Sequence, residues 1–161
     1  ASVREHRPSR ILASLNDAVW LGHEADAVCT ALYTTVDVNG AKARITVASG
    51  GHPLPLVLRD DGHVEQIGRP GTLLGIDAKP LLVDATYELG PGETVFFYTD
   101  GLLDAYAPGR VVQPSDLEAV LRACAGRPPS EILGAMEESF LDSEEVDPRD
   151  DVAIVVLQVS R

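Results

Sequence analysis

Apolar residues recur along this chain with two different periods, and each period predicts its own kind of element. Between Pro8 and Gly22 they recur every three or four residues, which predicts an amphipathic helix with Trp20 among its core positions. Runs of apolar and β-branched residues predict strands, and Asn39-Gly40 between two such runs is a strong hairpin signal. The expected strands span residues 28–38, 43–48, 54–58, 64–67, 81–89, 95–98 and 152–157. Taken in order, they predict a meander of antiparallel strands.

Two further helices are expected after the sixth strand. Ser115 with Glu118 three residues later is typical of a capping box, and an apolar stripe continues from there to Cys124. Pro128-Pro129 opens a second stripe that ends at Phe140. Strands in succession, then helices and a final strand, indicate an α+β protein.

Composition narrows the class of protein. The 161 residues predict a single domain without linker or repeat, and 45% of them are hydrophobic. Twenty-five acidic against thirteen basic side chains give a net charge of −12, which disfavours nucleic acid and anionic lipid as partners. No apolar run is as long as a membrane span, so we expect a cytoplasmic domain without membrane contact. Cys29 and Cys124 lie in apolar patterns and are expected to be buried free thiols.

The stretch from Glu93 to Ala105 contains the strongest candidate for chemistry. Residues 95–98 are apolar on both faces of a strand, which predicts a central strand covered on each side. Asp100 follows directly at the strand end, and Gly101 is expected to adopt a turn conformation that other residues avoid. We predict that Asp100 is a metal ligand, with Asp104 one helical turn later. The alternative is an ordinary Asp-Gly turn.

A second pair of carboxylates occupies an equivalent place. Residues 142–151 contain six acidic side chains and end in Asp150-Asp151, directly before the apolar run that starts at Val152. If Asp100 and Asp150 came within several Å they would repel each other unless a cation neutralised them. Hard oxygen ligands of this kind suit Mg²⁺ or Mn²⁺ better than zinc.

Glycines mark two more segments of interest. Ser49-Gly50-Gly51-His52-Pro53 lets the backbone pass close to a neighbouring strand or a ligand, and Gly51 and His52 could contact phosphate or simply form a structural turn. Residues 69–75 lack both the P-loop and the dinucleotide fingerprint, so they are expected to form a packing loop or a flap.

Together these segments resemble the SpoIIE/RsbU-type PP2C-like serine/threonine phosphatase domains of bacteria. The matching motifs, in the order of that family, are Ala48-Ser49-Gly50-Gly51-His52-Pro53, Leu73-Leu74-Gly75, Leu89-Gly90-Pro91-Gly92-Glu93, Tyr98-Thr99-Asp100-Gly101 and Asp150-Asp151-Val152-Ala153. The resemblance covers nearly the whole chain. It implies an antiparallel β-sandwich flanked by helices, with two Mg²⁺ or Mn²⁺ ions at one end.

The resemblance also assigns roles to individual residues. It makes Asp100 and Asp150 metal ligands, places Asp104 near a weaker third metal position, and gives Asp151 a supporting role beside the ligands. Ser49 stands where the family most often has Asn, so we expect no polar role for its side chain.

One motif of the family has no counterpart in this chain. The resemblance predicts an upstream Gly-Asp-Val-x-Gly-His-Gly segment whose Asp bridges both ions, and nothing in residues 1–12 matches it. We therefore expect residues 1–161 to form a single domain that lacks its amino-terminal part. Sensor domains are expected elsewhere in the full-length protein.

The implied function is metal-dependent hydrolysis of phosphoserine or phosphothreonine by an activated water. The family's usual substrate is a phosphorylated anti-anti-sigma (STAS) protein in a partner-switching pathway that controls a sigma factor and the stress response. Haloacid-dehalogenase-type phosphatases are disfavoured, because Tyr98 stands where their nucleophilic Asp would be. The remaining alternative is a non-catalytic PP2C-like interaction domain.

Overall fold

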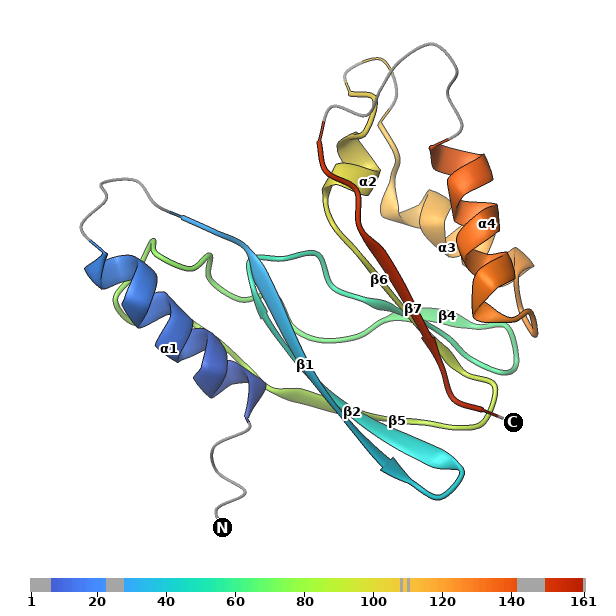
Figure 1. The fold of residues 1–161 in the computed structure, drawn as a ribbon, viewed down its shortest axis with the longest axis horizontal. Helices are drawn as coiled ribbons and strands as arrows, with labels where there is room; N and C mark the ends of the chain where they lie inside the picture. The colour runs from blue at the N-terminus through green and yellow to red at the C-terminus, as the bar shows by residue number, and fades with distance from the viewer. Residues whose placement is uncertain (1–6, 23–27, 108, 110, 142–149, 161) are drawn as a thin grey trace. The chain divides into compact units, whose positions relative to one another are not determined.

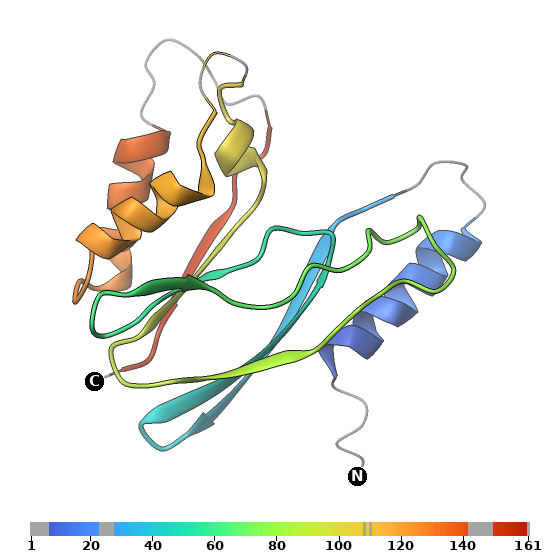
Figure 2. The same cartoon turned by 180° about the vertical axis from the view of Figure 1, so that it is seen from behind.

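A computed structural model of the 161-residue chain describes all residues except 1–6, 23–27, 108, 110, 142–149 and 161 (Figures 1 and 2). The chain forms two compact units. The first comprises Ala1–Leu54 with Ile67–Glu88, and the second comprises Pro55–Gln66 with Leu89–Arg161. Each unit is built around its own antiparallel sheet.

The first unit combines one helix with a three-stranded sheet. Its elements are α1 (Pro8–Leu21), β1 (Ala31–Asn39), β2 (Lys42–Gly50) and β5 (Ala85–Leu89), with strand order β1-β2-β5. The hairpin of β1 and β2 turns where the sequence predicts it, with Gly40 at a φ of 62° that favours glycine. Helix α1 packs on β1 and β2, and Leu12, Ala48 and Leu74 form the buried contact.

Asn16 connects α1 to the loop that precedes β5. Its side chain is fully buried, accepts a 2.9 Å hydrogen bond from the Gly75 amide and donates one of 3.0 Å to the Asp77 carbonyl. Leu74, which this loop carries, is also fully buried. Residues 69–75 therefore form a packing loop, one of the two alternatives that the sequence left open.

The second unit places two helices against one face of a four-stranded sheet. Its elements are β3 (Leu56–Leu58), β4 (Val64–Gln66), β6 (Thr94–Tyr98), α2 (Gly101–Asp104), α3 (Pro114–Ala123), α4 (Pro129–Phe140) and β7 (Ile154–Gln158). The strand order is β4-β3-β6-β7, so β6 is a central strand as predicted. Figure 1 shows α3 and α4 beside this sheet. Phe96 and Tyr98 of β6 pack with Leu117, Ile132 and other apolar residues of the helices in one buried cluster.

Arg59 joins three segments of the second unit. Its guanidinium, which follows β3, contacts the carboxylate of Glu65 in β4 at 2.6 Å and that of Glu93, just before β6, at 2.9 Å. Burial alone would lower the pKa of Arg59, but the hydrogen bonds to the two glutamates outweigh burial and raise the pKa above its ordinary value. This end of the sheet is thus fixed by a partly buried charge network.

Two predictions about elements were wrong. The strands do not form a simple meander, because β5 pairs in the first sheet whereas β6, the next strand, lies between β3 and β7. The capping box of α3 is made by Gln113 and Asp116 rather than by Ser115 and Glu118. Pro114 suits the first helical position, where its missing N–H needs no partner, and so the helix begins earlier than predicted.

Two residues predicted to be buried lie at the surface. Trp20 is 48% exposed, and Cys29 is exposed whereas Cys124 is buried as expected. Trp20 belongs to the last turn of α1, beyond the part that Leu12 and Asn16 attach to the unit. An apolar stripe identifies one side of a helix but does not show how far along the helix a partner covers it. Within the described residues, no helix is long and apolar enough to span a membrane.

Candidate metal centre

The end of β6 and the start of β7 lie at the same end of the second sheet. The two strands are antiparallel with Tyr98 opposite Ile154, and the Thr99 amide continues the ladder with a 3.1 Å hydrogen bond to the Ala153 carbonyl. Asp100 lies just after β6 at this end of the sheet, and Asp150-Asp151 lie just before β7 at the same end. Residues separated by about fifty positions in the chain are therefore brought to adjacent strand ends (Figure 1).

Asp100 stands between β6 and the four-residue helix α2. Its carbonyl accepts hydrogen bonds from the amides of Leu103 (2.8 Å) and Asp104 (3.1 Å), which places Asp104 one turn away as the sequence predicts. Both aspartate side chains are exposed. Among the described residues, the Asp100 carboxylate makes no capping bond to α2.

Gly101 is required here for a different reason than predicted. It is the first residue of α2 and does not have the positive φ of the glycines at true turns in this chain. A Cβ atom at this position would collide with the Asp151 carbonyl oxygen and approach the Asp150 carbonyl carbon to 3.5 Å. The absence of a side chain thus allows the Asp150-Asp151 backbone to pack directly against the start of α2.

Asp150 and Asp151 are exposed and anchored through the backbone. Asp150 Oδ1 accepts a 2.8 Å hydrogen bond from the Asp151 amide, and the Asp151 carbonyl accepts one of 3.1 Å from the Thr99 hydroxyl. The other four acidic residues of the predicted cluster lie in 142–149, outside the described residues. Sequence reasoning gave Thr99 no role. The sequence signal that could have pointed to Thr99 is a threonine directly before an aspartate at the end of a strand.

The side chains at this end of the second sheet are of the chemical type that binds hard divalent cations. Asp100, Asp104, Asp150 and Asp151 offer exposed carboxylate oxygens, which Mg²⁺ and Mn²⁺ prefer. In the part of the chain that the structure describes, no three His, Cys, Asp or Glu side chains are grouped so as to hold a metal ion. The assignment of these aspartates as ligands stays a prediction.

Gly51 and His52 belong to the first unit, not to the unit that carries the four aspartates. Gly51 has a φ of 76°, and a side chain there would meet Leu73, so the glycines let the backbone approach the packing loop. The buried Ser49 hydroxyl donates a 2.8 Å hydrogen bond to the His52 carbonyl. The expectation that Ser49 has no polar role was therefore wrong.

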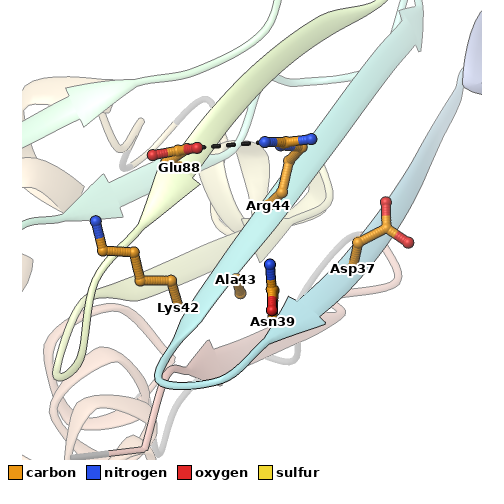
Figure 3. Close-up of a pocket in the computed structure, with 6 residues that line it drawn as sticks. All are labelled: Asp37, Asn39, Lys42, Ala43, Arg44 and Glu88. Atoms are coloured by element: carbon orange, nitrogen blue, oxygen red, sulfur yellow. Dashed lines mark hydrogen bonds and ion pairs between the residues drawn. The ribbon is translucent and has the colours of Figure 1, made fainter.

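Elsewhere on the first unit, a depression of about 270 Å³ lies beside the β1-β2 hairpin (Figure 3). Its lining residues are Asp37, Asn39, Lys42, Ala43, Arg44 and Glu88. Arg44 and Glu88 form an ion pair of 3.4 Å across β2 and β5, with both side chains more than half exposed. Exposed pairs of this kind contribute little to stability, and the depression contains none of the predicted site residues.

Solved structures define the class to which this fold belongs. The chain is similar to the SiaA PP2C domain of Pseudomonas aeruginosa, with a TM-score of 0.79 and 21% identity over 97% of this chain and 61% of that one. It is similar to the SpoIIE phosphatase domain of Bacillus subtilis, presoaked with manganese, with a TM-score of 0.65 and 15% identity over 99% and 69%. The catalytic domain of the phosphatase PstP, in complex with two manganese ions, gives 0.53 and 17% over 95% and 67%. The fold is that of PP2C phosphatase domains.

The family model for Stage II sporulation protein E (SpoIIE) matches residues 1–160. This chain therefore belongs to the SpoIIE family, as its motifs predicted. A search of the curated proteins gave no match. The chain spans about three-fifths of the SiaA domain that it resembles.

Proposed function

We propose that this chain is part of a metal-dependent protein phosphatase that hydrolyses phosphoserine or phosphothreonine. The observation that carries the proposal is the packing of the Asp150-Asp151 backbone against Gly101, directly after Asp100. Two separate segments that carry aspartates thereby meet at one end of the β6-β7 pair. Membership of the SpoIIE family supports the same reaction.

In this proposal, Asp100 and Asp150 hold the divalent cations. Asp104, one turn after Asp100, lies near a weaker third position, and Asp151 supports the ligands through its backbone. When bound, two such ions offset charge on the phosphoryl group and activate a water for in-line attack. The chain itself would contribute the ends of β6 and β7, next to which these aspartates lie.

The proposed substrate is a phosphorylated STAS-type anti-anti-sigma protein. One of the similar structures contains the RsbU and RsbW domains of Rv1364c from Mycobacterium tuberculosis, and it shares 22% identity with this chain. The net charge of −12 gives the chain no long-range attraction for a phosphate, so recognition must come from contacts around the site.

The test uses the full-length protein that contains this chain, with Mn²⁺ and a phosphoserine protein as substrate. We expect release of phosphate that requires the metal and is lost in Asp100→Asn and in Asp150→Asn. Asp17→Asn, a change at an exposed position of α1, is the matched control and should leave the rate unchanged. An intact full-length protein that releases no phosphate from any phosphoserine or phosphothreonine protein would contradict the proposal.

A second candidate is a non-catalytic domain that binds a regulatory partner through the same fold. It is favoured by the lack, in residues 1–12, of a match to the Gly-Asp-Val-x-Gly-His-Gly segment that the family resemblance predicts. Such a domain would bind its partner equally well with Asp100→Asn and without added metal. Calorimetric titration of the partner into both proteins separates the two candidates.

A further inference from the structure

Thr99 makes three hydrogen bonds to the segment that leads into β7. Its amide donates to the Ala153 carbonyl (3.1 Å), its hydroxyl donates to the Asp151 carbonyl (3.1 Å), and the same hydroxyl accepts from the Ala153 amide (3.0 Å). Both partners lie more than fifty positions away in the chain. One side chain therefore joins the two aspartate-bearing segments.

The position of this hydroxyl matters because the regular strand pairing stops there. The assigned pairs of β6 and β7 end at Tyr98 and Ile154, and residues 151–153 lie outside β7, so only the Thr99–Ala153 contact extends the ladder among the hydrogen bonds of the described residues. The Thr99 hydroxyl supplies both a donor and an acceptor to this irregular backbone. Thr99 is β-branched, which restricts its side-chain torsion and so limits where the hydroxyl can point.

Gly101 sets the other limit on the same segment. The Asp151 carbonyl, which accepts the Thr99 hydroxyl, is also the group that a side chain at Gly101 would displace. Thr99, the residue before Asp100, donates a hydrogen bond to the Asp151 carbonyl. Gly101, the residue after Asp100, leaves the space that this carbonyl occupies. Both residues therefore act on the position of the Asp151 carbonyl, which directly follows Asp150 in the chain.

We propose that Thr99 is a positioning residue that sets the affinity of the site for divalent metal. The proposal deepens the proposed function and rests on it. Thr99 acts through the backbone of residues 151–153, which places Asp150 relative to Asp100. Removal of a group that orients metal ligands commonly lowers metal affinity by about 10- to 100-fold.

Thr94 provides a matched control at the opposite end of the same strand. Its hydroxyl is fully buried and accepts a 3.0 Å hydrogen bond from Gln158 in β7. Thr94→Val and Thr99→Val therefore each remove one threonine hydroxyl that joins β6 to β7. They differ in their distance along the strand from the aspartates.

The experiment measures Mn²⁺ binding to the full-length protein by isothermal titration calorimetry, and melting temperature in EDTA. We expect Thr99→Val to weaken Mn²⁺ binding by about tenfold or more, and Thr99→Ser, which keeps the hydroxyl, to restore most of the affinity. Thr94→Val should lower the melting temperature and leave Mn²⁺ affinity unchanged. Wild-type affinity in Thr99→Val, or an equal loss of affinity in Thr94→Val, would overturn the proposal.

A measurement on the wild type covers the case in which Thr99→Val fails to fold. Paramagnetic Mn²⁺ should broaden the amide resonances of Thr99 and Ala153 before those of Thr94 and Gln158. Equal broadening at both ends of the strand pair would overturn the proposal. A wild-type protein that binds no Mn²⁺ would remove the metal site of the proposed function as well, whereas wild-type affinity in Thr99→Val removes only the role of Thr99.

Discussion

The carboxylate of Asp84 accepts two hydrogen bonds from Ser9 near the start of α1, one from the backbone amide at 2.7 Å and one from the hydroxyl at 2.9 Å. Ser9 lies in the first turn, where helix amides have no partner within the helix. A negative charge there also interacts favourably with the helix dipole. A residue 75 positions away thus performs the capping that Arg7, at the N-cap position, does not.

Removing this distant cap should destabilise the first unit. We expect Asp84→Ala to lower the free energy of unfolding by about 1 kcal/mol, the usual effect of losing a capping side chain. Urea unfolding followed by circular dichroism measures the change. Asp17→Ala, at an exposed position of the same helix, should change stability by less than about 0.5 kcal/mol. Equal effects of the two substitutions would show that Asp84 does not cap α1.

Gly101→Ala should damage the candidate metal centre, because a methyl group there meets the Asp151 carbonyl. We expect a loss of about 1–3 kcal/mol in unfolding free energy from overpacking, together with weaker Mn²⁺ binding. Gly134→Ala is the matched control, since a Cβ at that position of α4 has no neighbour within 4 Å. It should stabilise the protein by about 0.5–1 kcal/mol, because alanine suits a helix interior better than glycine. Unimpaired stability and Mn²⁺ binding in Gly101→Ala would contradict the close packing.

Tyr98 should make the protein less stable at alkaline pH. Burial, with a smaller contribution from Glu118, raises the pKa of Tyr98 above its ordinary value. In the unfolded chain Tyr98 releases its proton at about pH 10, whereas in the folded protein it still holds the proton at that pH. The unfolded chain therefore binds fewer protons than the folded protein above about pH 10. Stability is then constant with respect to this group below about pH 10 and falls as pH rises toward the folded pKa.

The comparison of two tyrosine variants isolates this effect. Tyr98→Phe should show a shallower alkaline decline in urea unfolding than the wild type, whereas Tyr33→Phe, at a 37% exposed position of β1, should decline as the wild type does. Cys124, whose pKa burial also raises, contributes a decline of the same sign that both variants share. Identical slopes for Tyr98→Phe and the wild type would refute the assignment.

The proposed phosphatase should discriminate strongly between a protein substrate and small esters. With a net charge of −12 and no long-range attraction for phosphate, efficient turnover depends on docking of the substrate protein. We expect kcat/KM of the full-length protein to be highest for a phosphorylated STAS protein, lower for a phosphopeptide derived from it and lowest for p-nitrophenyl phosphate. Equal values for protein and peptide would exclude the docking argument.

Sequence patterns predicted the elements whose signals are local. The helix at Pro8–Leu21, the hairpin at Gly40 and the burial of β6 follow from periodicity and turn chemistry within short windows. The shorter β5, which begins at Ala85 instead of residue 81, shows the limit of such patterns. A strand ends where its partner ends, and the partner lies elsewhere in the sequence.

The parts that the sequence did not predict are contacts between distant residues. Asn16 in α1 bonds Gly75 and Asp77, and nothing near Asn16 in the chain indicates these partners. For the candidate site, the placement of Asp100 and Asp150 at strand ends was predictable from the apolar runs beside them. The hydrogen bonds of the Thr99 hydroxyl and the close packing of the Asp151 carbonyl on Gly101 depend on the pairing of β6 with β7. Local sequence patterns do not specify this pairing.

The pairing of β6 with β7 also orders events during folding. Thr94 and Gln158 are 64 positions apart, so joining these strands closes a long loop, and contacts of this kind form late and slowly. β6 can pair with β3 before residues 150–158 have left the ribosome, at a stage when the Asp150-Asp151 segment cannot yet join the end of β6. A nascent chain would thus form the sheet of β4, β3 and β6 first and join the Asp150-Asp151 segment to the end of β6 last.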